Sequence, residues 1–64
     1  MSNFIELTEK TAGNKIFINI NTIVYIENAY DMHKNEYSRI HLLNDKTISV
    51  EESRLKIQTI INKI

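Results

Sequence analysis

The sequence predicts a small α+β domain: a five-stranded antiparallel meander, able to coil toward a small barrel, followed by one C-terminal helix. Two patterns carry this prediction. Apolar and polar residues alternate with a period of two through most of residues 4–50, as in half-buried strands. After Ser53 the isoleucines recur every three or four residues, as on one side of an α-helix. The chain has 64 residues, so positions 1–64 are expected to form one domain.

The first two strands flank the only glycine in the chain. Ile5 and Leu7 are expected to point to one side of the first strand and residues 4, 6 and 8 to the other, and a second alternating run covers residues 15–20. Between them lies a polar turn at 10–14, in which Gly13 can adopt the positive φ that most residues avoid. We therefore expect these two strands to form a hairpin.

The third strand follows a short corner at Asn21-Thr22 and leads into a polar segment. Val24 and Ile26 continue the alternation, which places both side chains on the core side of the sheet. Residues 28–36 are polar and aperiodic, and this composition predicts a long loop before the fourth strand.

The connection between the last two strands, 37–43 and 47–51, is predicted from their register. A two-residue loop would pair apolar residues of one strand with the polar side of the other. A three-residue loop, Leu43-Asn44-Asp45, instead puts Ile40 on the same face as Ile48, because directly paired residues share a face. Asp or Asn also tolerates the left-handed backbone that this loop requires.

The C-terminal helix is expected to begin after Ser53, a favourable N-cap residue that follows two glutamates. Leu55 falls outside its apolar stripe, which comprises Ile57, Ile60, Ile61 and Ile64. So short a helix does not persist alone in water, so the stripe must pack on the sheet or on another subunit. We expect it to cover the apolar face of the sheet. That face is predicted to hold Ile5, Leu7, Ile16, Ile18, Ile20, Val24, Ile26, Ile40, Leu42, Ile48 and Val50.

Composition limits the classes of function open to the chain. Eight acidic residues balance eight basic ones, so no long-range field attracts nucleic acid or an anionic membrane. The chain has no cysteine for disulfides or thiolate metal sites, and no apolar run long enough for membrane insertion. The first residues lack a signal-peptide pattern, so a cytoplasmic location is expected. Because so short a chain buries little surface, we expect a homo-oligomer.

No constellation in the sequence is typical of an enzyme, a cofactor site or a metal centre. Glycine-rich phosphate loops, cysteine nucleophiles and Gly-x-Ser-x-Gly turns are missing. Asp31 and His33 supply two potential metal ligands where a site needs at least three, so neither a metal nor a cofactor is expected. The sequence therefore predicts a protein that binds rather than catalyses.

The candidate interaction surface is aromatic. Four aromatic side chains, with Leu43, are expected on the sheet face opposite the core, which is more than a small sheet requires. The alternative is that a coiled sheet buries these rings in a second small core. Tyr30 and His33 in the predicted loop are further candidates for contacts. The four aromatic residues are Phe4, Phe17, Tyr25 and Tyr37.

Three stretches of the sequence resemble a known family. Residues 4–8 end in Leu-Thr, residues 18–27 hold an Asn-x-Asn-x-Ile corner followed by Ile-Glu, and residues 48–53 read Ile-Ser-Val-Glu-Glu-Ser. This order is similar to the small FlbD/SwrD-type flagellar and swarming motility family, including its phage and mobile-element relatives. The chain departs from the family in its longer segment at 28–36, and in Asp45 at the hairpin glycine. The resemblance implies a small module that acts through contacts with another protein.

Two further classes of function are kept as alternatives. Residues 24–27, with the later strands, also resemble the LytTR-type DNA-binding domain, which is longer and more basic. Aromatic rings beside Lys34, Arg39 and Lys46 would suit contacts with nucleic acid or another anion, since bases stack on such rings. A phage-encoded inhibitor or small-ligand sponge would instead form its sites between the subunits of an oligomer.

Overall fold

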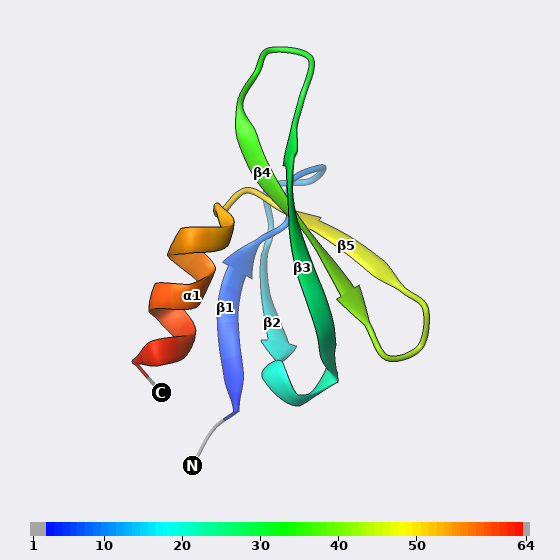
Figure 1. Ribbon diagram of the computed structural model, residues 1–64, viewed down its shortest axis with the longest axis vertical. Coiled ribbons are helices and arrows are strands. Elements are labelled where there is room, and N and C mark those ends of the chain that lie inside the picture. Colours follow the sequence, from blue (N-terminus) through cyan, green and yellow to red (C-terminus); the bar gives the residue numbers. More distant parts are fainter. Residues whose placement is uncertain (1–2, 64) are drawn as a thin grey trace.

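The computed structural model describes residues 3–63 and shows two antiparallel sheets and one helix (Figure 1). One sheet is a two-stranded hairpin, and the other has the strand order β3-β4-β5. The α+β class with a C-terminal helix is thus confirmed. The elements are β1 (Phe4–Thr8), β2 (Lys15–Asn19), a 3-10 helical turn (Ile20–Thr22), β3 (Ile23–Tyr30), β4 (Glu36–Leu42), β5 (Thr47–Val50) and α1 (Arg54–Asn62).

The prediction of a single five-stranded meander coiled toward a barrel is wrong. β2 and β3 follow each other in sequence but belong to different sheets, because the 3-10 turn redirects the chain between them. Asn19 starts this turn: its side chain accepts a hydrogen bond from the Asn21 amide (2.9 Å), and its carbonyl accepts one from the Thr22 hydroxyl (2.7 Å). These local bonds replace the ladder that a meander would form at this point.

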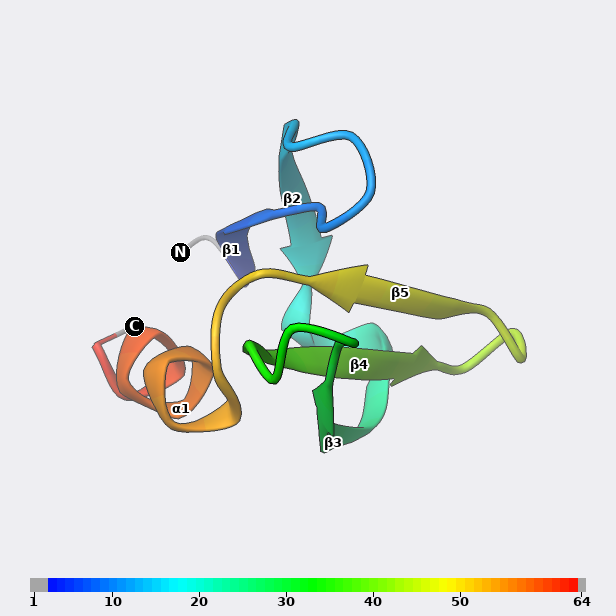
Figure 2. The same ribbon diagram turned by 90° about the horizontal axis from the view of Figure 1, so that it is seen from above.

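The two sheets meet where the chain leaving β1 passes the end of β5. The Glu51 amide donates to the Thr8 carbonyl (2.8 Å), and the Lys10 amide donates to the Ser49 carbonyl (2.9 Å). An isolated antiparallel bridge pairs Glu9 with the last residue of β5. This contact, which we call the sheet junction, is too short to form a common sheet, but it ties the two sheets together (Figure 2).

The predicted loop at 28–36 is wrong in its extent. β3 and β4 pair as far as Tyr30 and Glu36, so the loop covers only residues 31–35. Pairing overrides the polar composition, because each strand satisfies the main-chain groups of the other even where the hairpin extends away from α1 and β1 (Figure 1).

The β4–β5 hairpin has the predicted register. Ile40 pairs with Ile48, and the hydrogen bond between Leu42 and Lys46 continues this register, so residues 43–45 form the three-residue loop. Asp45 holds the left-handed position with φ of 63°, and the Leu42 amide donates to the Lys46 carbonyl (2.8 Å) across the loop. The register and the loop length predicted from the hydrophobic pattern are therefore confirmed.

A β-bulge at the start of β3 changes the expected core. Ile23 pairs with Leu42 and Tyr25 pairs with His41, which leaves Val24 as an extra residue. Val24 is therefore 55% exposed, contrary to its predicted place in the core, and Ile23 packs against the core instead. Alternation alone cannot locate a bulge, because one inserted residue reverses the inward and outward positions on one side of it.

One small core joins both sheets and the helix. It takes residues from the inner faces of the two sheets and from the apolar side of α1. Its buried apolar side chains are Ile5, Leu7, Ile18, Ile40, Val50 and Ile57. Every residue of this set was expected in the core or in the helical stripe. Ser38 is also buried, and its hydroxyl has no hydrogen-bond partner among the described residues.

The helix begins and packs as predicted. The Ser53 side chain caps it by accepting a hydrogen bond from the Lys56 amide (3.2 Å). Ile57 is buried and Leu55 is 77% exposed, whereas Ile64 of the predicted stripe lies outside the described residues. The other two stripe residues, partly buried at the edge of the core, are Ile60 and Ile61. Within residues 3–63, no helix has the length and apolar character needed to cross a membrane.

Candidate interaction surfaces

The structure divides the predicted aromatic surface between two sheets. Phe4 and Phe17 lie on the outer face of the β1–β2 hairpin, whereas Tyr25 and Tyr37 lie on the outer face of the three-stranded sheet. Because the inner faces of both sheets enclose the same core, the two outer faces do not form one surface. Phe4, Phe17 and Tyr25 are 52%, 71% and 53% exposed. The alternative prediction, in which these rings are buried in a second small core, is therefore wrong for these three residues.

Exposed apolar side chains gather where the bulge of β3 approaches the β4–β5 loop. Val24, Tyr25 and Leu43 are all more than half exposed. Together with His41 they border a hollow of about 220 Å³, with Asp45 and Lys46 also lining it. We call Val24, Tyr25, His41 and Leu43 the corner surface. The bulge, which the sequence pattern did not reveal, is what turns Val24 outward to complete it.

The ring of Tyr25 is held in place by its neighbours. It stacks on the imidazole of His41, with ring centroids 4.1 Å apart and planes 13° from parallel. The Nε2 atom of His41 lies 2.7 Å from a carboxylate oxygen of Glu27, and its Nδ1 atom lies 3.3 Å from the Thr47 hydroxyl. A side chain that is already oriented loses little conformational entropy on binding, which favours Tyr25 as a contact residue.

Tyr37 is partly covered by cations. The Lys10 ammonium lies 4.7 Å from the centroid of its ring and forms an ion pair with Asp31 (3.1 Å). The Arg39 guanidinium donates to the Tyr37 hydroxyl at 3.4 Å, and this contact raises the pKa of Arg39. Tyr37 therefore links the turn after β1 to the β3–β4 hairpin rather than standing free for a partner.

The candidate loop at 31–35 is organised by Asp31 rather than by a ligand. Its Oδ1 atom accepts hydrogen bonds from the amides of His33 and Asn35, both at 2.9 Å. The pKa of Asp31 is lowered to about 2, most strongly by the hydrogen bond from the Asn35 amide, then by Lys10 and the His33 amide. Together these contacts outweigh the effect of burial, which raises the pKa. Tyr30 and His33 are both exposed at this end of the molecule, away from the corner surface.

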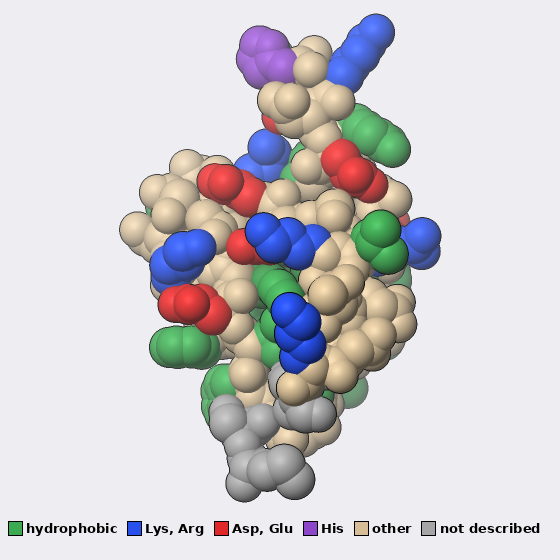
Figure 3. All heavy atoms as spheres, turned by 90° about the vertical axis from the view of Figure 1, so that its left-hand side faces the viewer, with side chains coloured by type: hydrophobic (Ala, Val, Ile, Leu, Met, Phe, Trp, Pro, Cys, Tyr) green, Lys and Arg blue, Asp and Glu red, His purple; other side chains and the backbone are tan. Residues whose placement is uncertain are grey.

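The three candidate cations are not brought together. Lys34 lies in the loop at one end of β4, Lys46 follows the loop at the other end, and Arg39 lies between them. Arg39 also pairs across the strands with the acidic residue Glu27. On the side of the molecule that carries α1, Lys and Arg side chains are interspersed with Asp and Glu (Figure 3). These residues do not form one positive patch.

Hydrogen bonds of Glu52 connect the end of β1 to the segment just before the helix. Its carboxylate accepts hydrogen bonds from the Thr8 amide (2.9 and 3.1 Å) and from the Thr8 hydroxyl (3.0 Å). The Lys15 ammonium donates to the same hydroxyl at 2.9 Å. Burial opposes ionisation of Glu52, but the hydrogen bonds and the Lys15 charge outweigh it and lower its pKa. Two of the stretches that carry the family resemblance, residues 4–8 and 48–53, thus meet through Thr8 and Glu52.

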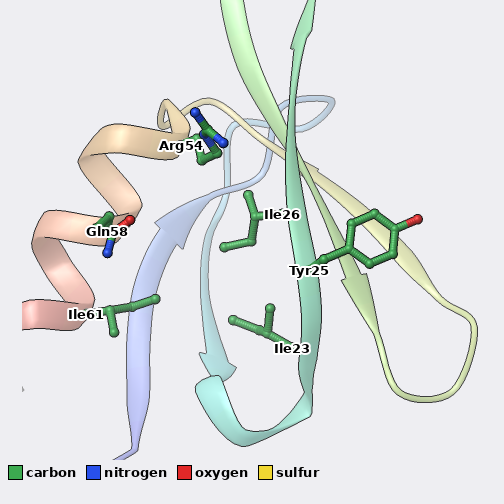
Figure 4. A pocket seen from close by; sticks show the side chains of 6 residues that line it. All are labelled: Ile23, Tyr25, Ile26, Arg54, Gln58 and Ile61. Carbon is green, nitrogen blue, oxygen red and sulfur yellow. The ribbon is translucent and has the colours of Figure 1, made fainter.

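A groove of about 280 Å³ runs between β3 and α1 (Figure 4). Tyr25 also lines it, although the ring of this residue points away from the groove (Figure 4). The other lining residues are Ile23, Ile26, Arg54, Gln58 and Ile61. The sequence pattern alone did not reveal this groove. Its signal was the spacing of Arg54, Gln58 and Ile61, which puts them on one side of the helix, along the edge of the apolar stripe to which Ile61 belongs.

The chain was compared with protein families, curated proteins and solved structures. No protein-family model, curated protein or solved structure matches the chain. Among residues 3–63, no group of three or more His, Cys, Asp or Glu side chains is placed to hold a metal ion. The fold and its surfaces define a small α+β domain with an apolar recess on each side of β3.

Proposed function

We propose that the protein is a small non-enzymatic protein-interaction module whose corner surface contacts its partner. The observation that carries this proposal is the clustering of Val24, Tyr25 and Leu43, which are exposed apolar side chains on adjoining elements. Apolar groups gathered at one exposed place favour association, because a partner removes them from water. Tyr25 is the expected anchor, since interface energy concentrates in aromatic residues that are already oriented.

The resemblance to FlbD/SwrD-type motility proteins supports the same proposal. The contact between Thr8 and Glu52 gives the stretches that carry the resemblance a role in holding the fold together. The corner surface is then the part available to a partner. We also propose that the protein acts in the cytoplasm as a homo-oligomer, because its core is small and self-association would cover outer rings such as Phe17.

The test compares variants of the corner surface with a matched variant elsewhere. Wild-type protein, Tyr25→Ala, Leu43→Ser and the control Leu55→Ser are used as bait in lysates of the source cells. A partner that binds wild type and Leu55→Ser, but neither corner variant, is then purified and titrated against each protein. Loss of binding by about tenfold or more in the corner variants supports the proposal. Equal binding by all four proteins, or no partner at all, contradicts it.

A nucleic-acid-binding function is the second candidate, and one observation favours it. The stacked Tyr25–His41 pair lies beside Lys46, and an aromatic surface next to a cation suits a base and its phosphate. Gel shifts at low and high salt test this function, because binding through phosphates must weaken as salt increases. An inhibitor or small-ligand sponge is a third proposal. It requires sites between subunits, so a strict monomer in light scattering would exclude it.

A further inference from the structure

We infer that the groove between β3 and α1 binds the carboxyl-terminal end of an extended peptide, which pairs with the free edge of β3 and places its carboxylate on Arg54. This inference rests on the proposed function, a module that binds other proteins. It concerns a second site, because the groove and the corner surface lie on different sides of β3. Figure 4 shows Ile23 and Ile26 directed toward the groove and the Tyr25 ring directed away from it.

The edge of β3 that faces away from β4 is open to an added strand. In the strand order β3-β4-β5, β3 is terminal, so among the described residues this eight-residue strand pairs along one edge only, with β4. A terminal strand offers main-chain donors and acceptors that an added strand can use. Tyr25 lines the groove although its ring is directed away from it, so the groove borders the strand itself at this residue.

The walls of the groove are apolar, with one cation at its end. Ile23 and Ile26 from β3 and Ile61 from α1 supply apolar contacts for alternate side chains of an added strand. Arg54 lies at the end of the groove next to the start of the helix (Figure 4). Its guanidinium has no ion pair or hydrogen bond among the described residues. A guanidinium beside an apolar groove is complementary to a carboxylate attached to an apolar chain.

The end of the groove at Arg54 favours an occupant whose chain ends there. Arg54 is the first residue of α1, so the connection from β5 lies directly beyond it. A peptide running toward Arg54 meets this connection, which favours a chain terminus over a continuing chain. β3 also runs from Ile23 toward this end (Figure 4). The peptide is therefore expected to lie parallel to β3, with its last residues near Ile26 and its carboxylate on Arg54.

The experiment uses immobilised heptapeptides whose last two positions cover every pair of amino acids, made with a free carboxylate and again as amides. The full chain is tested as wild type, as Arg54→Gln and as Lys56→Gln, a control that removes an exposed charge of α1 outside the groove. We expect peptides with apolar ends to bind. Amidation or Arg54→Gln should weaken binding by about tenfold or more, as for loss of a charge-assisted hydrogen-bonded pair, and Lys56→Gln should not.

Amide chemical shifts locate the best peptide on the protein. Expected changes fall on β3 and α1, and a spin label at the peptide's first residue should broaden signals near Ile23 and Ile61. The proposal is overturned if no peptide binds, if amidation or Arg54→Gln has no effect, or if the β3 edge proves to pair with a second copy. Leu43→Ser must keep peptide binding. If the peptides fail while a partner still requires the corner surface, only this inference falls and the proposed function stands.

Discussion

Two adjacent apolar residues of β2, Phe17 and Ile18, differ strongly in burial. Ile18 is 5% exposed and Phe17 is 71% exposed. We predict that Ile18→Asn unfolds the domain, because it removes core contacts and buries an unpaired amide, a loss of about 4 kcal/mol or more. The matched change Phe17→Asn should leave the thermal midpoint almost unchanged. Circular dichroism melts of both variants are the measurement, and similar midpoints would show that the inner and outer faces are misassigned.

Asp31 makes stability depend on pH in a defined window. Its pKa falls from the ordinary value of 3.8 to about 2, so its contribution is complete above about pH 5 and is lost as the pH falls through 2. We expect Asp31→Asn to flatten the loss of stability over this window and to speed exchange of the His33 and Asn35 amides. Denaturation curves and hydrogen exchange measure both effects. Glu36→Gln, an exposed carboxylate on the same hairpin, is the control for the two amides.

Whether a single residue lies in the core could be predicted where the alternation of the strand is regular. It could not be predicted where the main chain has an irregularity such as a bulge. Ile5 and Ile40 were placed in the core from alternation alone, and both are buried. Val24 was misplaced because the bulge depends on pairing with β4, which is not encoded by the spacing of β3 itself. Asp31 was considered as a metal ligand, whereas its carboxylate closes a turn through main-chain amides that any sequence would supply.

At the scale of elements, the β4–β5 loop depends on one left-handed residue. Asp45 has φ of 63°, which glycine adopts freely and β-branched residues avoid. We predict that Asp45→Gly keeps or slightly raises the free energy of unfolding, whereas Asp45→Val lowers it by about 1–2 kcal/mol. Chemical denaturation measures the two changes. Equal stability of the glycine and valine variants would mean that the loop can adopt another conformation at no cost.

The contact of Glu52 with Thr8 connects β1 to the start of α1, so its loss should affect both elements. Glu52→Gln keeps the shape of the side chain and removes the charge, and we expect a loss of about 1 kcal/mol at neutral pH, since the site is partly exposed. Because the pKa of Glu52 is lowered from its ordinary value of 4.5, this contribution is present above that value and disappears as pH falls. Glu51→Gln, an exposed neighbour, is the control.

Elements with their own local signals were predictable, and their arrangement was not. The register of β4 with β5 and the Ser53 cap each follow from residues close in sequence. The switch of sheets between β2 and β3 depends on side-chain hydrogen bonds at Asn19 and Thr22, and the same residues could equally form an ordinary hairpin turn. The groove was missed for a related reason: it exists only because α1 packs beside β3.

At the scale of the whole molecule, β3 links all the proposed binding features. The molecule measures 38 × 25 × 20 Å, and the β3–β4 hairpin extends along its length (Figure 1). The first residues of β3 supply the corner surface on one side and the groove on the other. An eight-residue strand paired on one edge can serve two surfaces only if the rest of the fold holds it firmly. The small core and the sheet junction must provide that rigidity.

The sheet junction therefore predicts that the two sheets unfold together. The Lys10 and Glu51 amides cross between them at 2.9 and 2.8 Å, next to the buried Val50. We expect these amides to exchange with solvent only through global unfolding, whereas the Lys34 amide in the exposed hairpin loop exchanges through local opening. Hydrogen exchange in increasing denaturant distinguishes the two routes. Opening of Lys10 and Glu51 below the global free energy would instead show that the β1–β2 hairpin separates first, leaving β3 with a core too small to hold it in place.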